Sequence, residues 1–470
     1  MKAKNKMRNF FIYFGIIFTS QAFAQSIVLP RYNEFISGIL QNNPLSKRAS
    51  NEKNYGELLL KAARGNYDPM LSGNYDQKKF AGSNYFTMLN SEIRQPIFTN
   101  QYLKLGYDYG IGPNLNPEYS TPSQGLPYVG LEVGVLQGLV IDKRRAEVLK
   151  SREYVSYYTA EQQIQLNNLL FESSQRYFEW LFSAKQIALN NYFMDAARKR
   201  LEGIEALANV GERATMDTVE AAILYQTRLL DLQNAQMDNL KSTNELSTFI
   251  WLNNAPSALI NTYQAVDSLE TYYNKAKGVL AENLNILNGQ NPILAKYSAL
   301  QNVLDVDVRL KKEMIKPVLN VKYNFLSNNS TPTNPAFSNN NYKWGLNMSF
   351  PLLLRNPRNE YKMAQIVSQN NNLELLTKTN ELNFKVNTLR QTISILAQQL
   401  LNAERSVNYG KLLLEAENLK FENGESSLFM LNTRENKLLE SELKLAEYKL
   451  KFIKAILNII YLNGNLKYTL

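Results

Sequence analysis

Cysteine and histidine are both absent from this 470-residue chain. Their absence removes disulfides, thiolate nucleophiles, imidazole bases and the ligands of nearly every zinc, haem or copper site. A lipoprotein anchor, which needs an N-terminal cysteine, is not expected either. Most enzyme chemistry depends on these two residue types, so the sequence predicts no catalytic residue, no metal and no cofactor.

Long apolar runs and enzyme motifs are missing too. Nothing in the chain approaches 18 consecutive apolar residues, so no membrane-spanning helix is predicted, and a membrane location would require strands. No GxGxxG, P-loop or GxSxG motif lies in a suitable strand-to-helix context, which argues against an enzyme. Lys and Arg outnumber Asp and Glu by 52 to 42 but are scattered, so nucleic acid is not an expected partner.

The first 24 residues have the pattern of a secretory signal peptide. A positive region contains Lys2, Lys4, Lys6 and Arg8. It is followed by an apolar stretch of nine residues, 10–18, and by an Ala22-Phe23-Ala24 cleavage site. We expect the mature chain to begin at Gln25 and to leave the cytoplasm. The alternative is an anchor helix that stays attached.

Two very long helical regions dominate the remainder. Residues 142–250 contain no Pro and only Gly203 and Gly211, and residues 358–462 contain no Pro and only Gly410 and Gly424. A helix of roughly 60 residues is about 90 Å long and needs coiled-coil packing. Heptad spacing is found at Leu439, Leu443, Ala446, Leu450, Ile453, Leu457 and Ile460, and at Leu170, Ser174, Tyr177, Leu181, Ala184 and Ala188. Either seam alone could also be an ordinary core-facing stripe.

Two pairs of strands are predicted from alternating apolar and polar residues. The first pair covers 103–109 and 129–135, and the second covers 319–325 and 342–350. Each run is close to the length of a tilted membrane-spanning strand. Such alternation is also typical of a soluble, half-buried sheet, and the partnership with giant helices favours the membrane interpretation.

The two halves align at an offset of 213 residues, which predicts a tandem duplication. Residues 145–147 fall on 358–360, Gly138 falls on Pro351, and Gly211-Glu212 falls on Gly424-Glu425. We expect repeats over 25–250 and 291–470, with a short equatorial segment over 251–290. The Gly-Glu pairs are predicted helix tips at which the chain reverses, although they could be kinks in continuous helices.

Four strands per chain cannot close a wide barrel alone. Threefold assembly would give a 12-stranded outer-membrane β-barrel continued by a helical tube. The predicted fold class is therefore an α+β membrane protein, with a long antiparallel α-helical coiled-coil barrel joined to this trimeric barrel. Two further strand-like runs lie within 66–98, near 70–76 and 84–94. They could add strands to the barrel or fold back on the periplasmic side, and we expect the latter.

The sequence resembles the TolC-like outer-membrane efflux proteins over nearly the whole mature chain. The resemblance rests on the duplicated plan and on QGLVIDKRR at 137–145, FPLLLRNPR at 350–358 and FENGESSL at 421–428. It implies a homotrimer in outer-membrane lipid with a periplasmic tunnel. It also implies partnership with a periplasmic adaptor protein and an inner-membrane pump, in tripartite efflux or type I secretion. The cargo and the particular pump are not predicted.

Site residues follow from the same resemblance, by position. Adaptor docking and the helix tips are assigned to Gly211, Glu212, Gly424 and Glu425. The entrance lining is assigned to Asp217 and Glu220 in the first repeat and to Met430 and Thr433 in the second. In the family, acidic residues just after the second tip tend to line the closed entrance. Because the second pair here is not acidic, we expect this constriction to be absent or moved, and cation selectivity is not carried over. The alternative function is an exported structural coiled coil of the cell envelope without channel activity.

Overall fold

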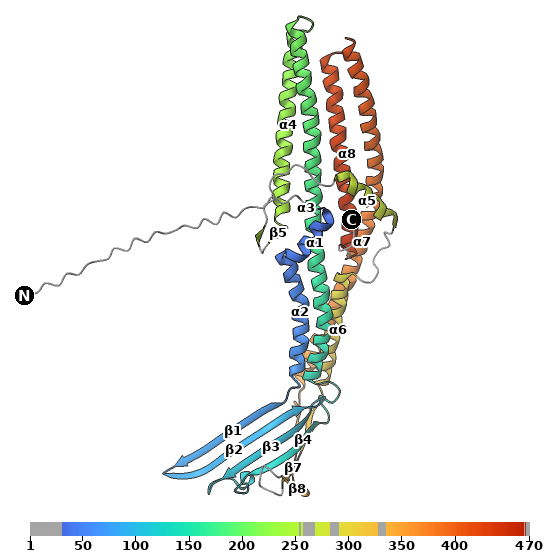
Figure 1. The fold of residues 1–470 in the computed structure, drawn as a ribbon. Coiled ribbons are helices and arrows are strands. Elements are labelled where there is room, and N and C mark those ends of the chain that lie inside the picture. The colour runs from blue at the N-terminus through green and yellow to red at the C-terminus, as the bar shows by residue number, and fades with distance from the viewer. Residues whose placement is uncertain are drawn as a thin grey trace, which may run out of the picture.

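The computed structural model describes residues 31–252, 255–256, 268–282, 291–327, 335–464 and 466. The predicted signal peptide lies outside these residues. The molecule is elongated, with two helical hairpins at one end, a sheet at the other and shorter helices between them (Figure 1). No helix in the described ranges is both long enough and apolar enough to cross a membrane.

Four long helices form two antiparallel hairpins. The first hairpin contains α3 (Lys143–Asn209) and α4 (Thr215–Ser247), and the second contains α7 (Arg355–Glu422) and α8 (Leu428–Leu462). The 67 residues of α3 correspond to about 100 Å of helix. These bounds confirm the two predicted helical regions. In the predicted seam of α8, six of the seven residues are buried and Leu443 is half-buried.

Shorter helices occupy equivalent places in the two halves. They are α1 (Tyr32–Asn42), α2 (Pro44–Gly65), α5 (Leu269–Glu282) and α6 (Pro292–Glu313). Both α2 and α6 have 22 residues, start with Pro and are capped by an Asn, Asn43 or Asn291, whose side chain accepts a bond from the first turn. Both pack along the sheet-proximal part of α3.

One antiparallel sheet lies at the end opposite the helix tips. Its strand order is β1-β2-β3-β4-β7-β8, and it is open, with β1 and β8 as its edges. The strands are β1 (Met70–Phe80), β2 (Ser83–Pro96), β3 (Gln101–Ile111), β4 (Leu126–Gly134), β7 (Val318–Ser327) and β8 (Phe337–Ser349). The loop between β3 and β4 contains a short 3-10 helix, Pro117–Tyr119, and β5 (Trp251–Leu252) with β6 (Ala255–Pro256) forms a separate short pair.

The expected placement of the extra strands was wrong. The strand β2 does not fold back but pairs with β3 from Pro96 opposite Tyr102 to Thr87 opposite Ile111, and β1 pairs with β2. The free edge of β3 offers unpaired backbone groups that a neighbouring antiparallel strand satisfies. Six strands of the described chain therefore share this sheet, where four were expected.

These two strands are an insertion relative to the second half. The Asn-Pro starts of α2 and α6 lie 248 residues apart, whereas the tip glycines lie 213 apart. Most of the difference of 35 residues falls between α2 and β3, where β1 and β2 are located. The two halves otherwise have the same order of helix, strand pair and helical hairpin.

The two faces of the sheet differ in polarity. Residues paired across antiparallel strands share a face. One such row consists of Leu71, Ile93, Leu105, Val129, Phe325 and Tyr342 and is apolar throughout. The opposite face carries Asn90, Glu92, Arg94, Lys104, Asp108, Glu132, Lys322 and Lys343. The sheet is therefore apolar on one side and charged on the other.

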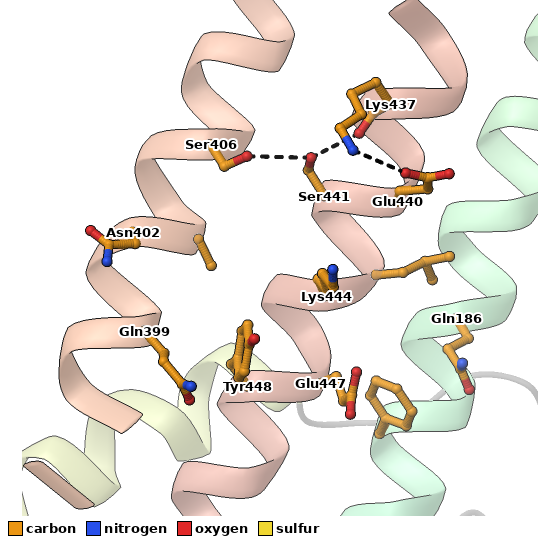
Figure 2. Close-up of a pocket in the computed structure, with 13 residues that line it drawn as sticks. Gln186, Gln399, Asn402, Ser406, Lys437, Glu440, Ser441, Lys444, Glu447 and Tyr448 are labelled. Carbon is orange, nitrogen blue, oxygen red and sulfur yellow. Dashed lines mark hydrogen bonds and ion pairs between the residues drawn. The ribbon is translucent and has the colours of Figure 1, made fainter. Parts of the chain in front are cut away.

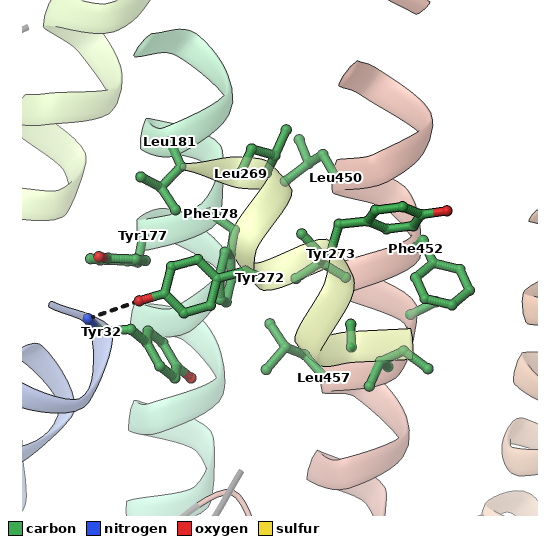
Figure 3. Close-up of a cluster of buried hydrophobic side chains, with 14 of the residues drawn as sticks. Tyr32, Tyr177, Phe178, Leu181, Leu269, Tyr272, Tyr273, Leu450, Phe452 and Leu457 are labelled. Carbon is green, nitrogen blue, oxygen red and sulfur yellow. Dashed lines mark hydrogen bonds between the residues drawn. The ribbon is translucent and has the colours of Figure 1, made fainter. Parts of the chain in front are cut away.

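The main hydrophobic core lies midway along the molecule, where α1 and α5 pack on α3 and α8 (Figure 3). Aromatic rings of Tyr32, Tyr177, Phe178 and Tyr272 contact one another, with centroids 5.2–6.2 Å apart. The Tyr32 hydroxyl lies 2.7 Å from Ser174 Oγ. Burial raises the pKa of Tyr32 to about 12, and the bond to Ser174 opposes part of that rise.

Candidate functional site at the helix tips

Both predicted tips are true chain reversals. Gly211 has φ +78° and Gly424 has φ +74°, a left-handed conformation that glycine adopts without strain. The N–H of Glu212 donates to the carbonyl of Leu207, and the N–H of Glu425 donates to that of Lys420, so each helix ends in a Schellman-type turn. The alternative of kinks in continuous helices is therefore wrong.

The two tips contact each other across the hairpins. The Arg213 guanidinium lies over the Phe421 ring, 4.6 Å from its centroid. Behind this contact Ile204, Ala221 and Leu428 form a small buried cluster from three helices. The first tip is thereby attached to the second.

A buried ionic cluster lies below the tips, and we call Arg200, Arg228 and Glu435 the clasp. Glu435 on α8 is 2% exposed, and its Oε2 lies 2.5 Å from Arg200 Nη2 on α3. Its Oε1 lies 3.8 Å from Arg228 Nη2 on α4. The carboxylate thus receives one cation from each helix of the other hairpin, and the clasp ties α8 to α3 and α4.

Polar side chains extend the clasp toward the tips. Arg200 also donates to Asn432 Oδ1 at 3.2 Å, and Asn432 Nδ2 donates to Glu220 Oε1 at 3.3 Å. Arg228 donates to Asn436. Because buried charges are costly unless paired, this network favours one arrangement of the two hairpins.

The structure brings only part of the predicted site together. Glu220 joins the clasp network through Asn432, whereas Glu212 and Glu425 are exposed on their turns. Asp217 lies in the first turn of α4, where the helix dipole favours a carboxylate. Met430 is 37% exposed, and Thr433 is exposed and bonds back to its own helix. In the described residues neither forms a hydrogen bond with Asp217 or Glu220.

Sequence reasoning missed all three clasp residues. Extended backwards from Leu439, the α8 seam passes through Glu435, Asn432 and Leu428 at steps of 4, 3 and 4. A charged residue at a coiled-coil core position is a recognisable signal for a polar contact between helices.

Two grooves adjoin these hairpins. One of about 760 Å³ lies beside the first tip and is lined in part by Val219, Ile223 and Leu230 of α4. The other, about 660 Å³, has mostly polar residues among those that line it and runs along α8 between α7 and α3 (Figure 2). In it Lys437 Nζ lies 3.3 Å from Glu440 Oε2, and the hydroxyls of Ser406 and Ser441 are 3.5 Å apart.

A second charged cluster lies on the polar face of the sheet. Glu132, 6% exposed, pairs with Lys104 at 2.8 Å and with Arg94 at 2.9 Å. Lys322 approaches it at 4.0 Å, and Lys104 also lies 3.5 Å from Glu92. Strands β2, β3, β4 and β7 are thus linked on this face. In the described residues no group of three or more acidic side chains is placed to hold a metal ion.

Neither family models nor curated proteins match this chain in sequence. Solved structures do match it in fold. The Campylobacter jejuni CmeC outer membrane channel aligns with TM-score 0.66 and 12% identity over 93% of this chain and 86% of its own. The fold is that of the TolC-like outer-membrane efflux channels.

Other members of this group match equally well. The Vibrio cholerae outer membrane protein VceC aligns with TM-score 0.64 and 13% identity, over 92% of this chain and 96% of its own. The open state of the Neisseria gonorrhoeae MtrE outer membrane channel aligns with TM-score 0.63 and 13% identity, over 93% of this chain and 89% of its own. The TolC-like likeness therefore extends over nearly the whole chain, from the sheet to the tips.

Proposed function

We propose that this protein is a passive exit channel of the outer membrane that extends into the periplasm. The observation that carries the proposal is the sheet with one apolar and one charged face, attached to coiled coils about 100 Å long. An apolar face suits lipid and a charged face suits an aqueous lumen. As a passive conduit, the protein needs no catalytic residue.

A homotrimer is part of the proposal, because single chains leave apolar helix faces uncovered. On α4 such a stripe consists of Met216, Val219, Ile223, Leu230, Met237 and Leu240, each at least 46% exposed. Its heptad spacing is that of a coiled-coil seam. On α7 Ile395, Leu401, Tyr409, Leu412 and Leu419 are each at least 56% exposed. Helices of neighbouring copies would cover both stripes.

The tips are the proposed gate and docking end. A periplasmic adaptor would bind around Gly211, Glu212, Gly424 and Glu425, beside the groove on α4, and an inner-membrane pump would supply the energy. Asp217, Glu220, Met430 and Thr433 are the proposed entrance lining. Adaptor binding would favour an open state by separating hairpins that the clasp holds together. Tripartite efflux and type I secretion are both compatible with this plan.

We also propose that the chain arose by tandem duplication, with repeats over 25–250 and 291–470 around the equatorial segment 251–290. The matched helix lengths and the Asn-Pro starts support this interpretation. The first 24 residues would be the signal peptide that exports it.

The test compares the channel with a non-conducting structural coiled coil of the envelope. The full chain, expressed with its signal, is fractionated, purified in detergent, sized by native mass measurement and added to a planar bilayer. We expect an outer-membrane location, three copies per particle and discrete ion-conducting steps. A particle that is soluble without detergent and produces no steps would favour the structural alternative.

A further inference from the structure

The inserted strands leave the sheet with two open edges at β1 and β8. No described strand pairs with the outer side of either. All eleven residues of β1 are exposed, and Tyr75 and Leu71 are 60% and 74% exposed. In a lipid environment, unpaired backbone N–H and C=O groups at such an edge are strongly unfavourable.

One six-stranded sheet cannot close around an open channel by itself, since even a barrel of eight strands has an interior that its own side chains fill. The strands alternate in direction from β1 to β8, and all long helices extend from the same end of the sheet. If neighbouring copies have their helices on the same side of the membrane, the β1 strands of two copies run in the same direction and could pair only as parallel strands. Pairing β8 with the next copy's β1 continues the antiparallel order.

The register of this pairing follows from strand lengths. Within the chain, one straight row joins Met70, Arg94, Lys104, Gly130, Asn324 and Lys343. If Lys343 lay opposite the next copy's Met70, only residues 337–343 of β8 would find partners in β1. A stagger of six residues, which places Ser349 opposite Met70, pairs all eleven residues of β1.

This stagger has the size that a closed barrel needs. A stagger of six residues on crossing the six strands of one copy corresponds to a shear of one residue per strand. An eight-stranded barrel with a shear of eight has the same ratio, and its strands tilt by about 36°. The full-overlap register is therefore compatible with closure.

The same register gives matched side chains across the seam. Tyr75 would face Trp344 and Leu71 would face Met348 on the apolar side. Asp76 would face Lys343 on the polar side. Aromatic, aliphatic and opposite-charge pairs are those that stabilise neighbouring strands.

We propose that the β1–β2 insertion forms the subunit seam, with β8 of one copy paired to β1 of the next. Each copy then contributes six strands to the membrane wall, eighteen in a trimer, in place of the twelve expected from four strands per chain. The proposal rests on the proposed trimeric channel. The strand that pairs with each open edge belongs to a second copy of this chain.

Disulfide cross-linking tests the seam, because the chain has no native cysteine. With Gly345→Cys fixed, a second cysteine replaces Ser72, Asn74 or Asp76 in turn. A Cβ at Gly345 meets no atom within 4 Å. Oxidation should yield covalent dimers and trimers, most strongly with Asn74→Cys, which lies opposite Gly345 in the full-overlap register. Single-cysteine variants are the controls.

The competing arrangement has its own pair. If the insertion lay outside the wall, β8 would meet β3 of the next copy. Four strands at one residue of stagger per strand give a stagger of four, which places Lys343 opposite Asp108, so Asp108→Cys with Lys343→Cys would cross-link. That result, or a conducting trimer in which no β1 pair cross-links, would overturn the seam and leave the channel standing. A monomeric, non-conducting particle would overturn both proposals.

Charge reversal provides a readout that needs no disulfide. Asp76→Lys and Lys343→Asp should each lower the temperature at which the trimer dissociates in SDS, and the double variant should restore it. Equal and additive effects of the two changes would contradict the predicted contact.

Discussion

Glu435 of α8 and Arg200 of α3 form an ion pair of 2.5 Å at a position where the coiled-coil seam would otherwise carry an apolar residue. The pair joins the two helical hairpins close to their tips. A buried carboxylate at this point gives the contact between hairpins a defined geometry, and it also makes that contact sensitive to loss of either partner.

Glu435→Ala should destabilise the tip half of the molecule, because it leaves Arg200 buried without its carboxylate and removes one of the two carboxylates that face Arg228. Removing one partner of a buried pair costs about 3–5 kcal/mol. Chemical denaturation followed by helical circular dichroism measures the effect. The matched variant Glu440→Ala removes an exposed carboxylate one turn away and should change stability by less than about 0.5 kcal/mol. Similar losses in both variants would show that the clasp contributes no special stability.

The contribution of the tip glycines to stability is predicted to come from their backbone conformation. Nothing lies within 4 Å of a Cβ built at Gly211 or Gly424, so Gly→Ala there should cost about 1 kcal/mol through left-handed strain. Gly203 is the matched control, since it lies inside α3, is equally uncrowded and has no positive φ. Gly203→Ala should stabilise by up to about 1 kcal/mol. A stabilising Gly211→Ala would contradict the turn geometry.

Two features that sequence reasoning missed have the same origin. The apolar heptad spacing of α8 ends at Leu439, and the next core position toward the tip is the charged Glu435, so apolar spacing alone does not reveal it. An alignment of the repeats at the single offset of 213 does not reveal the matching Asn43-Pro44 and Asn291-Pro292 starts, which lie 248 residues apart. Polar core positions and insertions both break the regularity on which pattern recognition depends.

The helices were predicted more accurately than the sheet. Helix bounds depend on local signals such as the proline-free runs and the tip glycines, and these agreed with the structure within a few residues. Strand placement depends on pairing between distant residues. The runs near Met70 and Asn84 were recognised as strands, but only the pairing of β2 with β3 shows that they extend the sheet.

High pH should weaken the equatorial core through Tyr32. Its pKa is raised to about 12 in the folded protein against an ordinary value of 10, so the folded state retains the proton longer. The associated stability is present below pH 10 and is lost as pH rises toward 12, by about 2–3 kcal/mol in total. Tyr32→Phe should remove this pH dependence. Parallel stability curves for the variant and the wild type between pH 9 and 12 would contradict the assignment.

Acid should weaken the contact between α3 and α8 at Glu179. Burial tends to raise the pKa of this carboxyl, but hydrogen bonds from Lys454 and Arg176 outweigh that effect and hold the pKa below its usual value. A lowered folded pKa means that the stability is present above about pH 4.5 and is lost as pH falls further. Glu179→Gln should be less stable at pH 7 and should lose less on acidification. If stability fell with decreasing pH equally steeply in Glu179→Gln and the wild type, the result would contradict a stabilising role of this ion pair.

Asp217 offers the most direct test of the proposed entrance. It lies in the first turn of α4, close to the tip, and its carboxylate pairs with no basic residue in the described structure. If it lines a narrow entrance, Asp217→Lys should shift the ion selectivity toward anions in bilayer recordings at low salt, because a charge near the lumen acts over about one Debye length. Asp238→Lys is the matched control, since Asp238 lies 21 residues, or three heptads, further along the same helix face and away from the tip. Equal changes in both variants would indicate a general surface-charge effect, and no change in either would place the entrance elsewhere.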